Sequence, residues 1–201
     1  MPKIVDRKKR RTELAEAAWR TIARRGIAQT TTRIVAREAG CSTGAIAHYF
    51  KGKEDLLRAA LQYSYAENDA AMAAQAANPG LEAIRSLLVT FLPVTPERRQ
   101  RWALWLAFAS RAATDPKTFQ ELLTRYDAWR DFAKRSLIEA QKRGEMPAEL
   151  DPGHEAQVLV AFVDGIGRQA ALEPKRWPRR LLLQAIDHYL SRLSVELRRA
   201  A

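Results

Sequence analysis

The chain has 201 residues, 47% of them hydrophobic, so it is long enough for one or two domains that bury a core. Its single cysteine, Cys41, excludes a disulfide framework and a cysteine-paired zinc site, and it fits a reducing compartment. The uncharged runs fall short of the roughly 20 apolar residues of a membrane span, and the basic amino terminus lacks the apolar stretch of a signal peptide. We therefore expect a soluble, cytoplasmic protein.

Positive charge is concentrated at the amino-terminal end. Residues 1–53 hold 13 Lys and Arg against 4 Asp and Glu, whereas residues 54–201 hold 21 against 19. The first segment therefore carries +9 of the net charge of +11. Such asymmetry is typical of a segment that meets a polyanion, either nucleic acid or an anionic membrane; the alternative is a solubilising tail at Lys8–Arg11.

Helical periodicity runs through nearly the whole chain, without sustained strand alternation, and predicts an all-α fold of about nine helices. The first three are expected to be short. One contains Leu14–Ala23 and ends at Gly26, one covers Arg33–Ala39, and one runs from Ser42 or Thr43 to Phe50. The hydroxyls of residues 30–32 are the expected caps of the second helix.

Six longer helices are expected beyond a turn at residues 51–53. The first of these ends near Asn78-Pro79-Gly80, and the last starts at Pro178. Between them, a capping residue followed by proline marks three further helix starts, because proline lacks only an amide that would be unpaired there. These starts are Thr95-Pro96, Asp115-Pro116 and Asp151-Pro152.

Residues 32–50 have the layout of a helix-turn-helix. Two short helices are joined by a turn containing Gly40, and the second opens with the small residues Ser42, Thr43 and Gly44. Small residues at a helix start allow close approach to phosphate oxygens or base edges. In this motif the second helix enters a DNA major groove.

Residues 32–57 contain Ala-Gly-Cys-Ser-Thr-Gly, His-Tyr-Phe and Lys-Gly-Lys-Glu-Asp-Leu-Leu, and this stretch resembles the DNA-binding half of the TetR family of bacterial regulators. Within the family, the Met1-Pro2-Lys3 start and Val163-Asp164-Gly165-Ile166 look most like the BetI-type subgroup. Cys41 stands where valine is more usual. The resemblance implies an amino-terminal three-helix DNA-binding domain and a larger effector-binding and dimerisation bundle. Charge and helix length place the boundary near Lys53, so the two expected domains are residues 1–53 and residues 54–201.

The resemblance also implies particular DNA contacts. Phosphate contacts are expected from Thr31 or Thr32, Thr43, Tyr49 and Lys53, and base-edge contacts from Thr43, Gly44, Ala45 and His48. The residues alone leave alternatives: Tyr49 as a half-buried aromatic, His48 as an exposed helix residue. Arg7–Arg11 suits either an arm that follows the minor groove or a disordered tail.

Aromatic residues gather on two helices of the larger part: Trp102, Trp105 and Phe108 on one, and Phe119, Tyr126, Trp129 and Phe132 on the next. They are either core or the lining of an effector pocket, which in a bundle lies between helices. We assign Trp102, Trp105, Phe108, Tyr126 and Trp129 to a pocket. The expected effector is a choline-like cation held by an aromatic cage, or a flat apolar aromatic molecule. Asp127 or Asp131 could point into the cage, but their spacing suits solvent-facing pairs with Arg130 or Arg135 about as well.

Broad apolar faces on the last two helices predict a homodimer interface. We assign to it Phe162, Val163, Ile166, Ile186, Tyr189 and Leu190. A twofold dimer matches a palindromic operator, with one recognition helix in each half-site. Gly165 and Gly167 are expected to allow close approach of helices.

The sequence predicts a regulator and no enzyme, metal or cofactor. The three histidines lack metal-ligand spacing, and Gly165-Ile166-Gly167 lacks the third glycine and the preceding strand of a dinucleotide loop. We expect a dimeric repressor that binds double-stranded operator DNA, releases it on binding a small molecule, and does not meet a membrane. The alternative is a constitutive DNA-packaging or membrane-surface protein, against which stands the nearly neutral remainder, residues 54–201.

Overall fold

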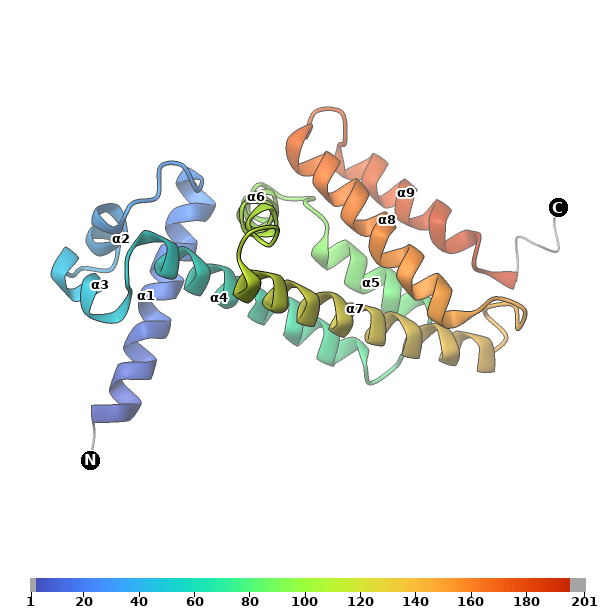
Figure 1. Cartoon of the computed structure of the whole chain (residues 1–201). Helices are drawn as coiled ribbons and strands as arrows, with labels where there is room; N and C mark the ends of the chain where they lie inside the picture. Colours follow the sequence, from blue (N-terminus) through green and yellow to red (C-terminus); the bar gives the residue numbers. More distant parts are fainter. Residues whose placement is uncertain (1–2, 196–201) are drawn as a thin grey trace.

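In the computed structural model, the described part of the chain, residues 3–195, folds into nine α-helices without a strand, which confirms the all-α prediction. Helices α1–α3 surround the start of α4 at one end, and α5–α9 form a larger bundle around its remainder (Figure 1). The helices are α1 (Lys3–Arg25), α2 (Thr32–Glu38), α3 (Thr43–Tyr49), α4 (Lys53–Gln75), α5 (Leu81–Phe91), α6 (Pro96–Arg111), α7 (Pro116–Lys142), α8 (Pro152–Leu172) and α9 (Arg179–Ser191).

The predicted cap–proline starts are confirmed. The side chains of Thr95, Asp115 and Asp151 each accept a hydrogen bond from a backbone N–H in the first turn of α6, α7 and α8. At the other end of a helix, Gly26 closes α1 with a φ of +80°, a conformation in which glycine avoids the steric penalty of a side chain.

The first helix is longer than the short helix predicted from residues 14–23. Helix α1 spans 23 residues from Lys3, so the basic segment Arg7–Arg11 is helical. The alternative of a disordered tail is therefore wrong for these residues, while the minor-groove contact stays a prediction, now for a helical segment. Local contacts such as Arg10 with Glu13, and the long-range contacts of Arg11 with Tyr49 and Asp55, accompany this helix.

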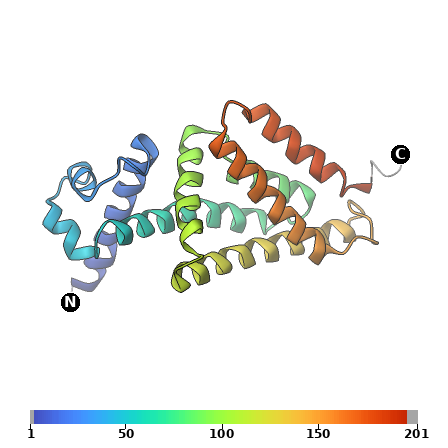
Figure 2. The same ribbon diagram turned by 45° about the horizontal axis from the view of Figure 1, so that its top comes forward.

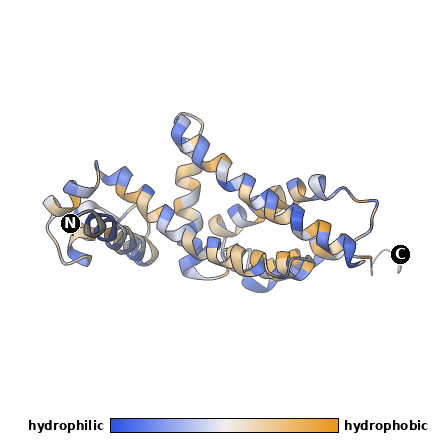
Figure 3. Cartoon of the chain, turned by 90° about the horizontal axis from the view of Figure 1, so that it is seen from below, coloured by the Kyte–Doolittle hydropathy of each residue, from blue (hydrophilic) through white to orange (hydrophobic). Residues whose placement is uncertain are grey.

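Two hydrophobic clusters build the core, and α4 belongs to both. The first cluster joins α1–α3 to residues 56–61 of α4, together with Leu104 and Phe108 of α6. The second fills the bundle of α5–α9, with Met72 at the far end of α4 packed against it. Helix α6 crosses α4 where the clusters meet (Figure 2). Figure 3 shows that most helices carry hydrophobic residues on one side and hydrophilic residues on the other.

The close contact between α6 and α8 depends on one glycine. Trp102, only 3% exposed, donates a hydrogen bond from its indole Nε1 to the Phe91 carbonyl over 2.9 Å. Its six-membered ring lies over Gly167, so closely that a Cβ atom there would stand 2.2 Å from the indole. Gly167 therefore allows the predicted close approach, here between helices of one chain.

We expect Gly167→Ala to lower the free energy of unfolding by about 2 kcal/mol, because the added methyl must displace a rigid, buried indole. The measurement is urea unfolding followed by circular dichroism. Gly165→Ala is the matched control: it lies in the same helix with open space around its Cβ, and it should leave stability unchanged or raise it. Equal free energies of unfolding for the two variants would contradict the close packing of Trp102 on Gly167.

Candidate functional site

The turn between α2 and α3 is shaped by small residues. Thr31 Oγ1 accepts a hydrogen bond from the Ile34 N–H at 3.3 Å, and Ser42 Oγ accepts one from the Ala45 N–H at 3.1 Å. Gly40 between the helices has a φ of +63°. These interactions fix the ends of both short helices and the reversal between them, as the sequence predicted.

One side of this helix pair is buried and the other is uncovered. Val35, Ile46 and Phe50 are buried in the first cluster, against α1 and α4. Most of the predicted DNA-contact residues remain accessible: Thr31, Thr43, Gly44, His48 and Lys53 are exposed, while Thr32, Ala45 and Tyr49 are partly buried. The exposed cations Arg33, Arg37 and Lys51 lie on or beside the same two helices and were not assigned a role from the sequence.

Tyr49 has the half-buried position that the residues alone allowed for it, and its phosphate contact stays a prediction. Its side chain is half-buried and packs against the first cluster, while its ring meets that of His48 edge-on, with 5.1 Å between the centroids. This contact joins an exposed residue of α3 to the domain core.

Arg11 ties α1 to the end of α3 and the start of α4. Its Nη1 donates a hydrogen bond to the Tyr49 carbonyl, its Nη2 lies 2.9 Å from Asp55 Oδ1, and its guanidinium stacks 4.4 Å above the Phe50 ring. Burial opposes ionisation of Asp55, but hydrogen bonds from the Lys51 N–H and from Arg11 hold the pKa of its carboxyl below the ordinary value. Arg11 is thus a positioning residue for α3.

An aromatic pocket lies in the bundle, where α4 and α5 meet α6, α7 and α8. We define the aromatic pocket by Tyr65, Phe91, Trp105, Tyr126, Trp129 and Asp164. It encloses about 40 Å³, and its rings meet edge-on: Phe91 with Trp129 at 4.3 Å, and Trp105 with Tyr126 at 6.4 Å between centroids.

The predicted pocket residues separate into two groups. Trp105, Tyr126 and Trp129 line the aromatic pocket. Trp102 is instead held in the core between Phe91 and Gly167 and does not line it. Phe108 belongs to the first cluster and lines a neighbouring groove between α4, α6 and α7. Tyr65 and Phe91 were not predicted as pocket residues from the sequence, because neither α4 nor α5 is rich in aromatic residues.

Two carboxylates line the aromatic pocket: Asp69 of α4, which pairs with Arg125 at 2.6 Å, and Asp164 of α8. Tyr126 donates a hydrogen bond from its hydroxyl to Asp164, and no ion pair to Asp164 is found among the described residues. Burial raises the pKa of this carboxyl, against the lowering effects of the Tyr126 hydrogen bond and the charges of Arg168 and Arg130. Of the two alternatives for Asp127 and Asp131, the solvent-facing one is found: both are exposed, and Asp127 pairs with Arg130 at 2.9 Å, so neither points into the cage.

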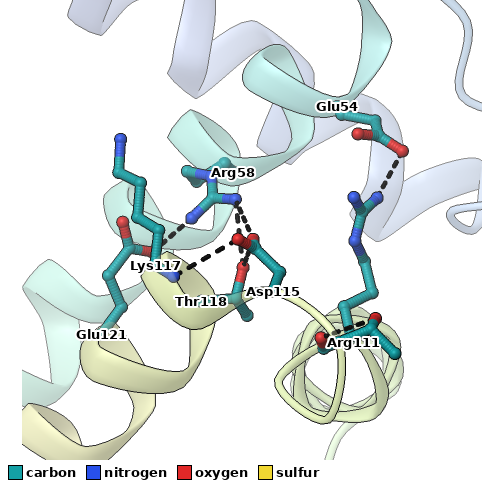
Figure 4. A network of polar contacts seen from close by, with 8 residues as sticks. Glu54, Arg58, Arg111, Asp115, Lys117, Thr118 and Glu121 are labelled. Atoms are coloured by element: carbon teal, nitrogen blue, oxygen red, sulfur yellow. Dashed lines mark hydrogen bonds and ion pairs between the residues drawn. The ribbon is translucent and has the colours of Figure 1, made fainter.

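A cluster of polar side chains connects the first turns of α4 to the turn between α6 and α7 (Figure 4). Arg58 of α4 lies 2.8 Å from Glu121, 3.2 Å from Asp115 and 3.1 Å from Thr118 Oγ1, and we name these four residues the Arg58 cluster. One turn earlier, Glu54 accepts a hydrogen bond from Arg111 at the end of α6. These contacts join the α6–α7 turn to the start of α4.

The apolar residues of α8 and α9 are divided between the core and the surface. Of the six assigned to a dimer interface, Val163, Ile166, Ile186 and Leu190 are buried inside the chain's own second cluster. The other two, Phe162 and Tyr189, are half-exposed and stack with 4.5 Å between their centroids. The exposed Val158 and Leu181 lie on the same two helices.

Within residues 3–195 no helix is both long and apolar enough to cross a membrane. Searching the same described part of the chain also finds no group of three or more His, Cys, Asp and Glu side chains arranged to hold a metal ion.

Two family models match the chain. Residues 14–60 match the bacterial regulatory proteins of the tetR family, and residues 80–195 match the carboxyl-terminal domain of BetI-type transcriptional repressors. The HTH-type transcriptional regulator PksA of Bacillus subtilis is 30% identical, over 98% of this chain and 95% of its own length. The regulator BetI of Burkholderia thailandensis is 29% identical, over 96% of this chain and 97% of its own.

Solved structures agree with these matches. A putative transcriptional regulator from Saccharomonospora viridis, crystallised in complex with choline, superposes with a TM-score of 0.75 at 25% identity, covering 92% of this chain and 96% of that one. The matches to both parts of the chain, together with the helix-turn-helix, establish that it belongs to the TetR family, with a BetI-type carboxyl-terminal domain, and is a DNA-binding transcriptional regulator.

Proposed function

We propose that this regulator is a homodimeric, cytoplasmic repressor, released from a palindromic operator when a quaternary ammonium compound of the choline type binds in the aromatic pocket. Residues 1–53 supply the DNA contacts, and residues 54–201 supply the effector site and the dimer contacts. The observation that carries the effector assignment is Asp164, a largely buried carboxylate set among aromatic rings.

The DNA assignment rests on charge and exposure. The first 53 residues hold most of the net positive charge, and α3 presents Thr43, Gly44 and His48 on its uncovered side. We assign phosphate contacts to Thr31 or Thr32, Thr43, Tyr49 and Lys53, and base-edge contacts to Thr43, Gly44, Ala45 and His48. A hydroxyl or an ammonium group suits a phosphate, which fixes position, while groove contacts carry sequence preference.

The effector assignment rests on the chemistry of the pocket. Aromatic faces attract a quaternary ammonium group, which cannot donate a hydrogen bond and so needs no acceptor array. Asp164 supplies the balancing negative charge. The choline complex of the Saccharomonospora viridis regulator, which has the same fold, supports this ligand class. A flat, uncharged aromatic effector is the other candidate, and it would use the rings without needing Asp164.

The dimer assignment rests on the surface of α8 and α9. We propose that the stacked pair Phe162 and Tyr189, with Val158 and Leu181, meets the same residues of a second copy. Half-exposed aromatic pairs beside exposed aliphatic side chains are typical of interface cores.

For DNA, we expect operator affinity to fall on the order of a thousandfold between 50 and 200 mM salt, as for about 6 neutralised phosphates. Lys53→Ala should weaken binding to all sequences alike, because an ammonium contacts the sugar-phosphate backbone. His48→Ala should instead alter base preference. Fluorescence anisotropy with operator and scrambled duplexes measures both, and an affinity independent of salt would contradict the assignment.

For assembly, we expect Phe162→Glu to give a folded monomer that no longer binds a palindromic operator, because two carboxylates would be buried across the twofold axis. Sedimentation velocity and circular dichroism measure this. Phe119→Glu is the control, since Phe119 is exposed on α7 and should leave the dimer intact. A wild-type chain that sediments as a monomer at micromolar concentration would contradict the interface.

For the effector, we expect choline to bind the wild-type protein and release operator DNA, and Asp164→Asn to weaken choline binding at least roughly tenfold through loss of the buried charge. Wild-type affinity should decline as pH falls through the raised pKa of Asp164, because protonation neutralises the carboxylate; the variant should show no such decline. Titration calorimetry measures both effects.

Asp127→Asn is the matched control for this measurement, because Asp127 is an exposed carboxylate that pairs with Arg130 on the outer side of α7. It should bind choline as the wild type does. An effector that binds Asp164→Asn and wild type equally well would instead favour the uncharged aromatic class.

A further inference from the structure

The aromatic pocket has a neighbour with which it shares a wall. A groove of about 220 Å³ lies between α4, α6 and α7, and the Arg58 cluster residues Arg58, Thr118 and Glu121 are part of its lining. The pocket and the groove share four lining residues: Tyr65, Trp105, Leu122 and Arg125. Arg125 is the one cation among the shared residues.

Arg125 already makes the interactions that an effector cation would make. Its guanidinium carbon lies 4.1 Å from the centroid of the Tyr65 ring, and its Nη1 lies 2.6 Å from Asp69 Oδ1. An aromatic face and a carboxylate are the two groups that hold a quaternary ammonium ion. A cation of the protein itself therefore covers one aromatic wall of the pocket.

The pocket in this state is too small for the proposed effector. Its volume of about 40 Å³ is close to the roughly 30 Å³ share of one water molecule in the liquid, whereas a choline-type ion has four carbon atoms around its nitrogen. Arg125 is one of the four residues that line both the pocket and the groove, so displacement of its side chain would enlarge the pocket toward the groove of about 220 Å³.

The contacts of Arg125 are weak enough to break readily. The side chains of Arg125 and Asp69 are 34% and 53% exposed, and ion pairs of such exposure are weak because water solvates both partners. Leaving the ring would return the guanidinium to water along a flexible side chain.

We propose that Arg125 is an internal competitor for the effector: its guanidinium occupies the cation position on Tyr65 in the free protein and is displaced when a quaternary ammonium ion binds. The inference rests on the proposed effector class. It makes Arg125 a specificity-determining residue, since only a cation that binds the aromatic wall better than a guanidinium opens the pocket.

The test is titration calorimetry of the full-length protein with tetramethylammonium and with choline. Arg125→Met removes the charge and keeps much of the side-chain volume. We expect it to raise the affinity for tetramethylammonium about tenfold, because the ligand no longer displaces a bound cation. Arg125→Gln should show the same direction and serves if the methionine variant folds poorly, with operator binding as the check on folding.

Arg135→Met is the matched control. Arg135 lies on the same helix and is exposed, and it lines neither the pocket nor the groove. Its loss should leave the affinity for tetramethylammonium unchanged.

Three outcomes would overturn the inference. Equal affinity of wild type and Arg125→Met would show that Arg125 does not compete, while the effector class would stand. Weaker choline binding by both Arg125 variants would make Arg125 a ligand contact, as for the anionic end of a zwitterion. No binding of either ammonium compound to any variant that still binds operator DNA would remove the proposed effector class itself.

Discussion

Helix α4 is packed into both hydrophobic clusters, and this shared packing is the constraint on which the rest of the structure depends. Its residues 56–61 are buried with α1–α3, and Met72 packs with the bundle. Because a continuous helix is stiff along its axis, a movement of α4 in one cluster also moves the part of α4 that is packed in the other cluster. The Arg58 cluster adds a second tie, from the first turns of α4 to the start of α7.

The aromatic pocket lies beside these contacts. Tyr65 of α4, Trp105 of α6 and Arg125 of α7 line both the aromatic pocket and the groove that reaches Arg58. A ligand that enlarges this space must separate side chains carried by those three helices. In the proposed mechanism, effector binding and the position of α4 are linked through these contacts. If the effector weakens operator binding, reciprocal linkage requires that operator DNA weaken effector binding by the same factor.

The sequence allowed prediction of features that depend on neighbours along the chain. The cap–proline starts, the turn glycine at residue 40 and the exposed start of α3 all follow local rules of helix ends. Part of the pocket lining was also predictable, because Trp105, Tyr126 and Trp129 come from segments that are rich in aromatic residues.

Features fixed by the packing of distant segments were not predictable. Asp164 reaches the aromatic pocket because α8 packs against α7, and the sequence could not decide whether Asp127 and Asp131 face the pocket or the solvent. Four apolar residues assigned to the dimer interface are buried because α8 and α9 cover their own bundle, and an apolar helical face does not reveal what covers it. The contacts of Arg11 in the basic segment are with Tyr49 and Asp55, which lie about 40 positions further along the chain.

The link between pocket and DNA-binding domain is most directly tested by hydrogen–deuterium exchange on the full-length protein with and without choline. The account predicts altered amide exchange at the aromatic pocket, at the α6–α7 turn around residues 111–118, and at the start of α4 around residues 53–61. All three changes should be absent in Asp164→Asn. Choline-induced release of the operator with exchange unchanged at the start of α4 would contradict the account.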